Sequence, residues 1–232
     1  MPRTLVALLA HNESECIAET VRELRSQLPQ VTVLAVDDGS SDDTAARALA
    51  AGAIVVRHPF NLGVAAGEAT GLAYAIAHGF DRVIRMDGDG QHDPRSATAL
   101  LEALDQGAEL VVGSRFLAER TFESSGLRRA ANRFLAALLT RLCGFAVTDP
   151  TSGYRAVAGR ALPYFAEHFP NQYPEPESLL MASRRGFKVK EVAVAMRPRR
   201  TGRSSLTPFR SAFYMLKVCF ALTLELLRPI ES

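Results

Sequence analysis

Strand-like apolar runs alternate with segments of helical spacing through the first half of this 232-residue chain, and this alternation constrains the fold most. We predict strands over Thr4–Ala10, Val31–Val36, Ile54–Val56, Arg82–Met86 and Leu110–Gly113. Helices are predicted between them, over residues 12–27, 40–51, 64–77 and 93–104. Strands separated by helices of this length are typical of βαβ units. The pattern therefore predicts an α/β fold with a mostly parallel, Rossmann-like central sheet flanked by helices.

The second half is less regular, and four prolines interrupt residues 163–176. We predict helices over Leu127–Leu142, Ser178–Arg185 and Phe209–Leu227, and a strand over Lys188–Val194. Because neither a repeat nor a linker divides the chain, a single domain is predicted over residues 1–232. No apolar run is long enough to predict a membrane span or a signal peptide. The three cysteines are far apart, which fits a reduced, cytoplasmic setting.

Acidic residues follow two of the predicted strands, at the edge where open α/β sheets bind ligands. Asp87 and Asp89 stand two residues apart after one strand, so both carboxylates can hold Mg²⁺ or Mn²⁺. An EF-hand is excluded because His92 and Thr98 occupy the positions of its glycine and its glutamate. The spacing therefore favours a divalent cation held beside phosphate groups.

The segment Asp37-Asp38-Gly39-Ser40 follows another predicted strand and allows two interpretations. It can cap the helix that comes next, or it can bind a nucleotide. In the second interpretation Asp38 accepts a hydrogen bond from a base N–H and Ser40 contacts the ribose. Uracil, thymine and guanine all present such an N–H, so the sequence does not choose among them.

Charge is divided unevenly, although the net charge is only +2. Residues 1–120 carry 17 acidic and 10 basic side chains, whereas residues 121–232 carry 8 and 17. Carboxylates in one half and arginines in the other suit a cation next to phosphate groups, and Arg115 ends a strand where it can grip a phosphate. Gly67 and Gly71 predict a flat helix face packed on the sheet, and both the dinucleotide-binding and the P-loop glycine motifs are missing.

Residues 188–210 are rich in arginine and lysine and directly precede the apolar helix at 209–227. The run has no interleaved aromatic platform, so nucleic acid is not a predicted partner. A basic segment beside an apolar helix favours contact with an anionic membrane surface. A core helix or a contact between copies of the chain is the alternative.

Taken together, these motifs resemble glycosyltransferase family 2 with the GT-A fold. The resemblance rests on Val36–Ser40, Asn61–Gly63, Asp87–His92, Gly113–Arg115, Asp149–Arg155 and Arg200–Ser205. These segments span most of the chain in the order of the family. The versions Asp-Gly-Asp-Gly-Gln-His and Thr-Ser-Gly-Tyr-Arg are most similar to the polyprenyl-phosphate glycosyltransferases. Residues 1–115 are then the nucleotide-sugar half, 116–205 the acceptor half, and 206–232 a helix that contacts the membrane surface.

The resemblance also implies roles for particular residues. Catalytic roles fall on Asp89 and Arg115, with Glu177 as first and Asp149 as second choice of general base. The donor nucleotide-sugar site would comprise Ala10, Asn12, Glu13, Asp37, Asp38, Ser40, Asn61, Gly63, Asp87, Gly88 and Arg115. The metal, Mg²⁺ or Mn²⁺, would lie among Asp87, Asp89 and Gln91. Phosphate and acceptor would meet Arg128, Arg129, Ser152, Arg155, Arg200 and Ser204.

Two departures from the family pattern stand out. Ser205 occupies a position where lipid-phosphate enzymes commonly carry lysine. A C-terminal pair of membrane spans, present in many bacterial relatives, is not predicted here. A small membrane protein and a second copy of the chain are therefore kept as candidate partners, with the chain peripheral on the cytoplasmic membrane face.

The implied activity is inverting, metal-dependent transfer of a sugar from a UDP-, TDP- or GDP-linked donor to a polyprenyl phosphate such as undecaprenyl or dolichyl phosphate. One alternative is transfer to a sugar hydroxyl of a cell-wall or polysaccharide acceptor. A sugar-nucleotide nucleotidyltransferase is another, but Ala10–Glu13 lacks the glycine- and lysine-rich loop expected there. A non-catalytic sugar-nucleotide-binding protein is the last, and the two acidic segments argue against it.

Overall fold

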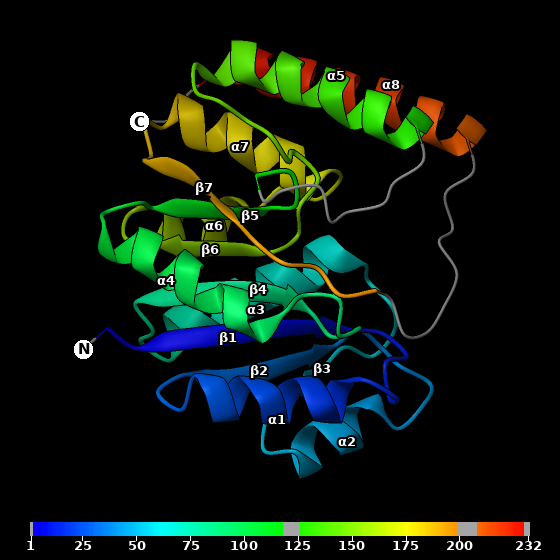
Figure 1. Cartoon of the computed structure of the whole chain (residues 1–232), viewed down its shortest axis with the longest axis vertical. Coiled ribbons are helices and arrows are strands. Elements are labelled where there is room, and N and C mark those ends of the chain that lie inside the picture. Colours follow the sequence, from blue (N-terminus) through cyan, green and yellow to red (C-terminus); the bar gives the residue numbers. More distant parts are fainter. Residues whose placement is uncertain (1, 118–125, 199–207, 230–232) are drawn as a thin grey trace.

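The computed structural model describes residues 2–117, 126–198 and 208–229, without the side chains of 126–128 and 208–214. One seven-stranded sheet runs through it in the order β3-β2-β1-β4-β6-β5-β7 (Figure 1). Its strands are β1 (Thr4–Ala10), β2 (Thr32–Asp37), β3 (Ile54–Arg57), β4 (Arg82–Asp87), β5 (Leu110–Ser114), β6 (Arg155–Ala158) and β7 (Val189–Ala193). The α/β fold with a mostly parallel sheet is therefore confirmed.

Strand β6 is the one antiparallel element of this sheet, and it lies between β4 and β5. No strand was predicted at the residues of β6. The strand has four residues, Arg155–Ala158, and it begins with a buried arginine, so it shows neither the length nor the apolar run of a central strand. Pairing with β4 and β5 stabilises this strand, and its own residue pattern does not predict it.

Eight α-helices accompany the sheet within the described residues. They are α1 (Ile17–Gln27), α2 (Thr44–Ala50), α3 (Val64–Ala77), α4 (Ala97–Asp105), α5 (Gly126–Cys143), α6 (Ala161–His168), α7 (Pro174–Arg184) and α8 (Pro208–Leu227). A 3₁₀ turn, Pro94–Ser96, leads into α4, and the Asp93 carboxylate caps this turn by accepting from Arg95 N over 3.0 Å. Helix α6 was not predicted, because a proline inside a helix removes a backbone hydrogen bond, but Pro163 lies in the first turn of α6, where it is tolerated.

Helices α1 and α2 begin later than the sequence analysis placed them, at Ile17 and Thr44 rather than at Asn12 and Ser40. The backbone N–H of Asn12 donates to Ser40 Oγ over 2.9 Å, and the Asn12 side chain accepts from Ser41 N over 2.9 Å. These polar residues therefore bind the two loops to each other before either helix begins.

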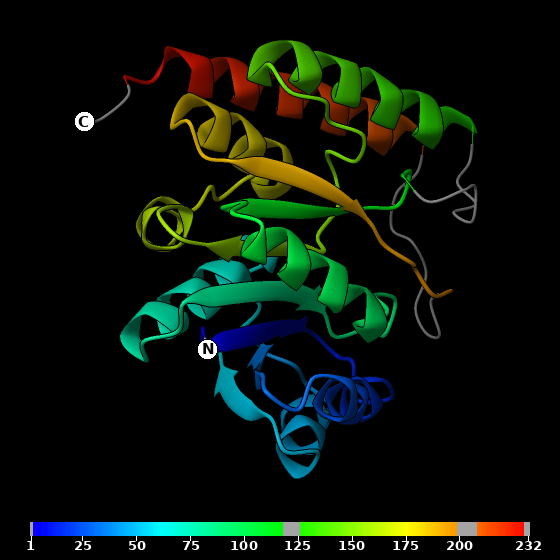
Figure 2. The same ribbon diagram turned by 60° about the vertical axis from the view of Figure 1, so that its left-hand side comes forward.

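Helices cover both faces of the sheet (Figures 1 and 2). Successive residues of β1 enter opposite cores: Leu5 and Ala7 pack on the side of α3, α6 and α7, while Val6 and Leu8 pack on the side of α1 and α4. A Cβ at Gly71 would lie 2.9 Å from that of Ala7, so the predicted close packing of α3 on the sheet is confirmed.

Helices α5 and α8 lie side by side as an outer layer, with α7 between them and the sheet (Figures 1 and 2). Val218 and Leu222 of α8 are buried in this layer, whereas Leu216, Phe220 and Leu227 are exposed. Within the described ranges, none of the helices has the length and apolar character needed to cross a membrane.

Candidate active site

A cleft of about 620 Å³ opens at the carboxyl ends of β1, β2 and β4. Parallel strands place these ends at one edge, where side chains after different strands meet. Of the predicted donor-site residues, Ala10, Glu13, Asp38, Gly63, Asp87 and Gly88 line the cleft. Asp89 of the predicted metal site lines it as well. The opposite wall comes from Thr151, Gly153 and the segment 171–175, which leads into α7.

Asp87 and Asp89 both face this cleft at the end of β4. Gly88 between them lies close against the fold, because a Cβ there would be 3.0 Å from both Ala10 Cβ and Ile17 Cδ1. The Asp89 side chain accepts from Gln91 N over 3.0 Å, which fixes the turn. The Asp87 side chain is 39% exposed, whereas Asp89 as a whole residue is 5% exposed.

Buried His92 supports the same turn from below. Its Nδ1 accepts from Asp87 N over 3.0 Å, and its ring stacks on Tyr154 with the centroids 4.7 Å apart. Burial lowers the pKa of His92, and the attraction of Asp87 does not reverse this. A neutral ring that accepts at Nδ1 carries its proton on Nε2, 3.8 Å from Asp87 Oδ2.

The donor set suits a hard divalent cation with an open coordination shell. Across the described residues, no three His, Cys, Asp or Glu side chains come together as a metal site. Asp87 and Asp89 could supply two carboxylate ligands and leave further positions to water and phosphate, which is how Mg²⁺ and Mn²⁺ are commonly held. Gln91, predicted with them, does not line the cleft, and its carbonyl accepts from Arg197 N over 2.8 Å.

Asp38 reaches the cleft with hydrogen bonds already made to its carboxylate. Its Oδ1 accepts from Leu62 N and pairs with His58 Nδ1, both over 2.8 Å, and its Oδ2 accepts from Gly63 N over 2.8 Å. Burial raises the pKa of Asp38, but the bonds from His58, Leu62 and Gly63 outweigh it and leave the pKa below its ordinary value. Asp38 thus holds the loop before α3 against the end of β2.

Two other residues of the predicted donor site, Asp37 and Ser40, are buried inside the loops after β2 and do not line the cleft. Asp37 is 1% exposed, accepts from Ser40 N over 3.1 Å and pairs with Arg57 over 3.1 Å. Ser40 is 2% exposed and accepts from Asn12 N, so its hydroxyl does not reach the cleft. Asn61 does not line the cleft, although Leu62 and Gly63 after it do. Neither Asp37 nor Ser40 caps α2, which begins at Thr44 with Asp42 accepting from Thr44 N over 3.0 Å, so their contacts join the loops instead.

Arg115 and Asp149 form an ion pair with each other. Arg115 Nε lies 2.6 Å from Asp149 Oδ2 and its Nη2 lies 2.7 Å from Oδ1, while Arg115 N donates to the same carboxylate over 3.0 Å. Asp149 is fully buried. Because both oxygens are engaged and out of reach of solvent, this geometry does not present Asp149 as a general base, and neither residue lines the cleft.

Two predicted acceptor residues, Ser152 and Arg155, are buried within the fold. The Ser152 hydroxyl donates to Gly113 O over 2.6 Å, and Arg155 donates to Ser152 O over 2.8 Å and to the Ser178 hydroxyl. Arg129 is exposed on α5. The Arg128 side chain, and Arg200 and Ser204 entirely, lie outside the described residues.

A cluster of charged side chains in the wall of the cleft was not predicted, and Arg85 and Glu175 of this cluster line the cleft. Arg85 of β4 lies 3.0 Å from Glu68 of α3 and 2.9 Å from Glu175 of α7, and its Nη2 lies 3.5 Å from Asp87. Arg155 faces Arg85 across the β4–β6 ladder. Burial raises the pKa of Glu68 to about 7, although Arg85 and Arg155 lower it. The signal in the sequence was an arginine inside an otherwise apolar strand.

Glu177, the predicted general base, does not line the cleft. Its carboxylate accepts from Tyr173 N over 2.7 Å, and burial followed by the nearby Glu225 raises its pKa. Glu175, two residues earlier, lines the cleft instead. Residues two apart on a helix point about 200° away from each other, so when Glu175 faces the cleft, Glu177 faces away from it.

The chain is similar to several known proteins. The model of the family "Glycosyl transferase family 2" matches residues 5–162. Polyprenol monophosphomannose synthase of Mycolicibacterium smegmatis is 31% identical over 226 residues, covering 93% of this chain and 85% of that protein. Undecaprenyl-phosphate mannosyltransferase of Micrococcus luteus is 29% identical over 214 residues, covering 88% of each.

A solved structure shares the fold. Glucosyl-3-phosphoglycerate synthase from Mycobacterium tuberculosis, in complex with Mn²⁺, UDP and phosphoglyceric acid, matches with a TM-score of 0.74 at 22% identity. The match covers 99% of this chain and 80% of that one.

Proposed function

The chain belongs to glycosyltransferase family 2 and has the GT-A fold, and we propose that it transfers a sugar from a nucleoside diphosphate sugar to a polyprenyl phosphate. The observation that carries this proposal is the pair Asp87 and Asp89 in a cleft at the carboxyl edge of the sheet. Relatives named for transfer to lipid phosphates support the choice of acceptor.

The donor diphosphate would lie over Asp87 and Asp89, with the nucleoside toward Asp38 and the loop at Leu62 and Gly63. A divalent cation bound there supplies positive charge that stabilises the departing nucleoside diphosphate. His92 fixes the Asp87 backbone, and Gln91 N fixes the Asp89 carboxylate, so both ligands are held before the donor arrives. Preorganised charge of this kind is effective because little reorganisation is needed during the reaction.

The acceptor would attack from the wall formed by Gly153 and residues 171–175. A phosphate oxygen displaces the nucleoside diphosphate from the opposite face of the anomeric carbon, so the configuration is inverted. A phosphate acceptor is already an anion at neutral pH and needs no carboxylate to take its proton. The engagement of Asp149 with Arg115 and the place of Glu177 outside the cleft agree with this acceptor.

A second opening supports a lipid on the acceptor phosphate. Gln172 and Tyr173 of the cleft wall also line a groove of about 360 Å³ with Leu216, Lys217 and Phe220 of α8. Leu216 is 70% exposed and Phe220 is 66% exposed. An apolar chain attached to a phosphate in the cleft can leave along this groove toward a membrane surface, on which α8 would lie.

The test is a product assay with the purified chain. UDP-, TDP- and GDP-linked sugars are each combined with undecaprenyl or dolichyl phosphate in detergent, with Mn²⁺, with Mg²⁺ or with EDTA. We expect metal-dependent release of a nucleoside diphosphate together with a charged glycolipid, separated by chromatography and identified by mass. A product found only on sugar hydroxyls would contradict the lipid-phosphate acceptor and direct attention to Glu175. Release of pyrophosphate from a nucleoside triphosphate would contradict the whole proposal.

A further inference from the structure

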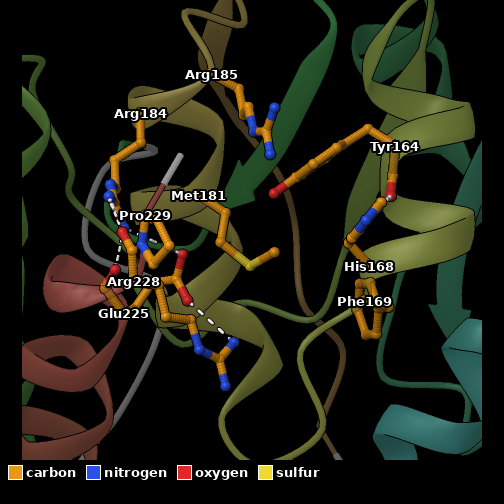
Figure 3. A pocket seen from close by; sticks show the side chains of 9 residues that line it. All are labelled: Tyr164, His168, Phe169, Met181, Arg184, Arg185, Glu225, Arg228 and Pro229. Atoms are coloured by element: carbon orange, nitrogen blue, oxygen red, sulfur yellow. Dashed lines mark hydrogen bonds and ion pairs between the residues drawn. The ribbon is translucent and has the colours of Figure 1, made fainter. Parts of the chain in front are cut away.

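A second cavity, of about 440 Å³, lies among α6, α7 and α8 (Figure 3). Tyr164, His168 and Phe169 border it on one side, and Met181, Arg184, Arg185, Glu225, Arg228 and Pro229 border it on the others. None of these residues lines the cleft. Helix α7 links the two, since Glu175 at its start faces the cleft and Arg184 at its end faces the cavity.

Positive charge exceeds negative charge around this cavity, where three arginines stand against Glu225. Arg184 binds the end of α8. It donates to Glu225 O and, over 2.6 Å, to Arg228 O, which are carbonyls at the end of α8. It also lies 3.5 Å from the Glu225 carboxylate. Arg184 and Glu225 therefore satisfy the end of α8 and each other, as cations near helix C-termini do.

The other two arginines are placed differently. The Arg185 guanidinium lies 4.7 Å from the centroid of the Tyr164 ring, which stacks on His168 at 4.9 Å. Arg228 lies 3.3 Å from Glu225, and its side chain is 73% exposed. Figure 3 shows the Arg185 guanidinium beside Tyr164 and the Arg228 guanidinium beside the Glu225 carboxylate, with Met181 between them.

We propose that this cavity binds an organic phosphate, a phosphate monoester carried on an aromatic or apolar body. Arg185 and Arg228 both line the cavity, a guanidinium group can hold phosphate oxygens in a bidentate manner, and the rings of Tyr164 and Phe169 can receive the body attached to the phosphate. The Met181 thioether adds an adaptable apolar contact. The site is separate from donor binding, because the cavity and the cleft share no lining residue.

Phenyl phosphate, which joins a phosphate monoester to an aromatic ring, is the probe. Calorimetric titration and thermal unfolding are measured with the full chain, with Arg185→Gln, with Arg228→Gln and with the double variant. We expect saturable binding that weakens about tenfold or more in the double variant, because charge-assisted hydrogen bonds are lost. Arg22→Gln, an exposed arginine on α1, removes the same charge elsewhere and is expected to bind as the wild type does.

Competition separates the cavity from the cleft. UDP with Mn²⁺ is expected to leave phenyl phosphate binding unchanged, and Asp89→Asn is expected to retain it. Displacement by UDP, or equal binding by the double variant, would overturn the proposal. If the double variant does not fold, the two single variants carry the same comparison.

Vesicles identify the source of the phosphate. Flotation with phosphatidylcholine vesicles is compared with and without phosphatidic acid, whose headgroup is a phosphate monoester. Binding that requires phosphatidic acid and falls in the double variant, but not in Arg22→Gln, would assign the cavity to a lipid headgroup. Binding of phenyl phosphate without vesicle binding would assign it to a soluble phosphate. Failure of both probes would contradict the site.

Discussion

Two acidic strand ends in this molecule look alike in sequence and serve different purposes in the structure. At the end of β2, Asp37 and Asp38 bind the fold itself, through Ser40, Arg57 and the loop before α3. At the end of β4, Asp87 and Asp89 border the cleft beside Gly88. Asp38 also lines the cleft, but its carboxylate is engaged by a distant loop, whereas the pair at β4 is the one that we propose to hold a cation.

The neighbouring backbone causes this difference. Leu62 and Gly63 bring two N–H donors from a distant loop onto Asp38, which lowers its pKa against the effect of burial. At the end of β4, the Asp89 carboxylate accepts from Gln91 N within its own turn, and the Asp87 side chain is 39% exposed, against 11% for that of Asp38. The two strand ends thus differ in that a distant loop engages the Asp38 carboxylate, whereas the Asp87 side chain stays partly open to the cleft.

The largest expected effect comes from Asp89→Asn. The amide oxygen still accepts from Gln91 N, but the charge that would hold a divalent cation is removed. We expect product formation to fall by about a thousandfold or more, equivalent to about 4 kcal/mol of transition-state stabilisation. Urea unfolding is expected to change by less than about 1 kcal/mol. Near-normal turnover of the folded variant in a nucleoside diphosphate release assay would remove Asp89 from the site.

For Asp38→Ala, the main expected effect is on stability rather than on product formation. Loss of this carboxylate leaves His58 and the N–H groups of Leu62 and Gly63 without an acceptor. We expect the free energy of unfolding to fall by about 2–4 kcal/mol in urea at neutral pH, because partly buried donors lose their partner. Exposed Asp43→Ala in the same loop is expected to change it by no more than about 0.5 kcal/mol.

A pH series adds to this test of Asp38. Its pKa is lowered in the folded protein, so its stabilisation is present above the ordinary carboxyl range and is lost as pH falls through the lowered pKa. The difference between wild type and Asp38→Ala is therefore expected to shrink in acid. A difference that stays constant down to acid unfolding would contradict the assignment.

A smaller effect of opposite sign is expected at Glu68, beneath the end of β4. Burial raises its pKa to about 7, so the folded protein holds a proton that the unfolded chain releases at lower pH. Stability is then lost as pH rises toward 7. Relative to Glu68→Gln, the wild type is expected to lose about 2 kcal/mol of unfolding free energy between pH 5 and 7. Urea unfolding at several pH values measures this.

Exposed Glu102→Gln on α4 is the matched control for Glu68, and its difference from wild type is expected to stay flat over the same pH range. A flat difference for Glu68→Gln as well would show that Arg85 keeps the glutamate ionised throughout. Together, the two pH series separate a carboxylate stabilised by its neighbours from one that burial disfavours.

The sequence by itself determined the alternation of strands and helices in residues 4–113 and the edge at which the acidic residues gather. Periodicity and strand direction suffice for this, because successive parallel strands end on the same side. The glycines of α3 were predicted for the same reason, since their four-residue spacing places them on one helix face.

Only the tertiary structure decided which polar groups cover one another. Strand β6 forms because β4 and β5 flank it, and the buried Asp149 carboxylate is paired with Arg115. Glu175 rather than Glu177 faces the cleft because of the direction in which α7 starts. These features depend on contacts between residues far apart in the chain, and local patterns of charge and hydrophobicity do not predict such contacts.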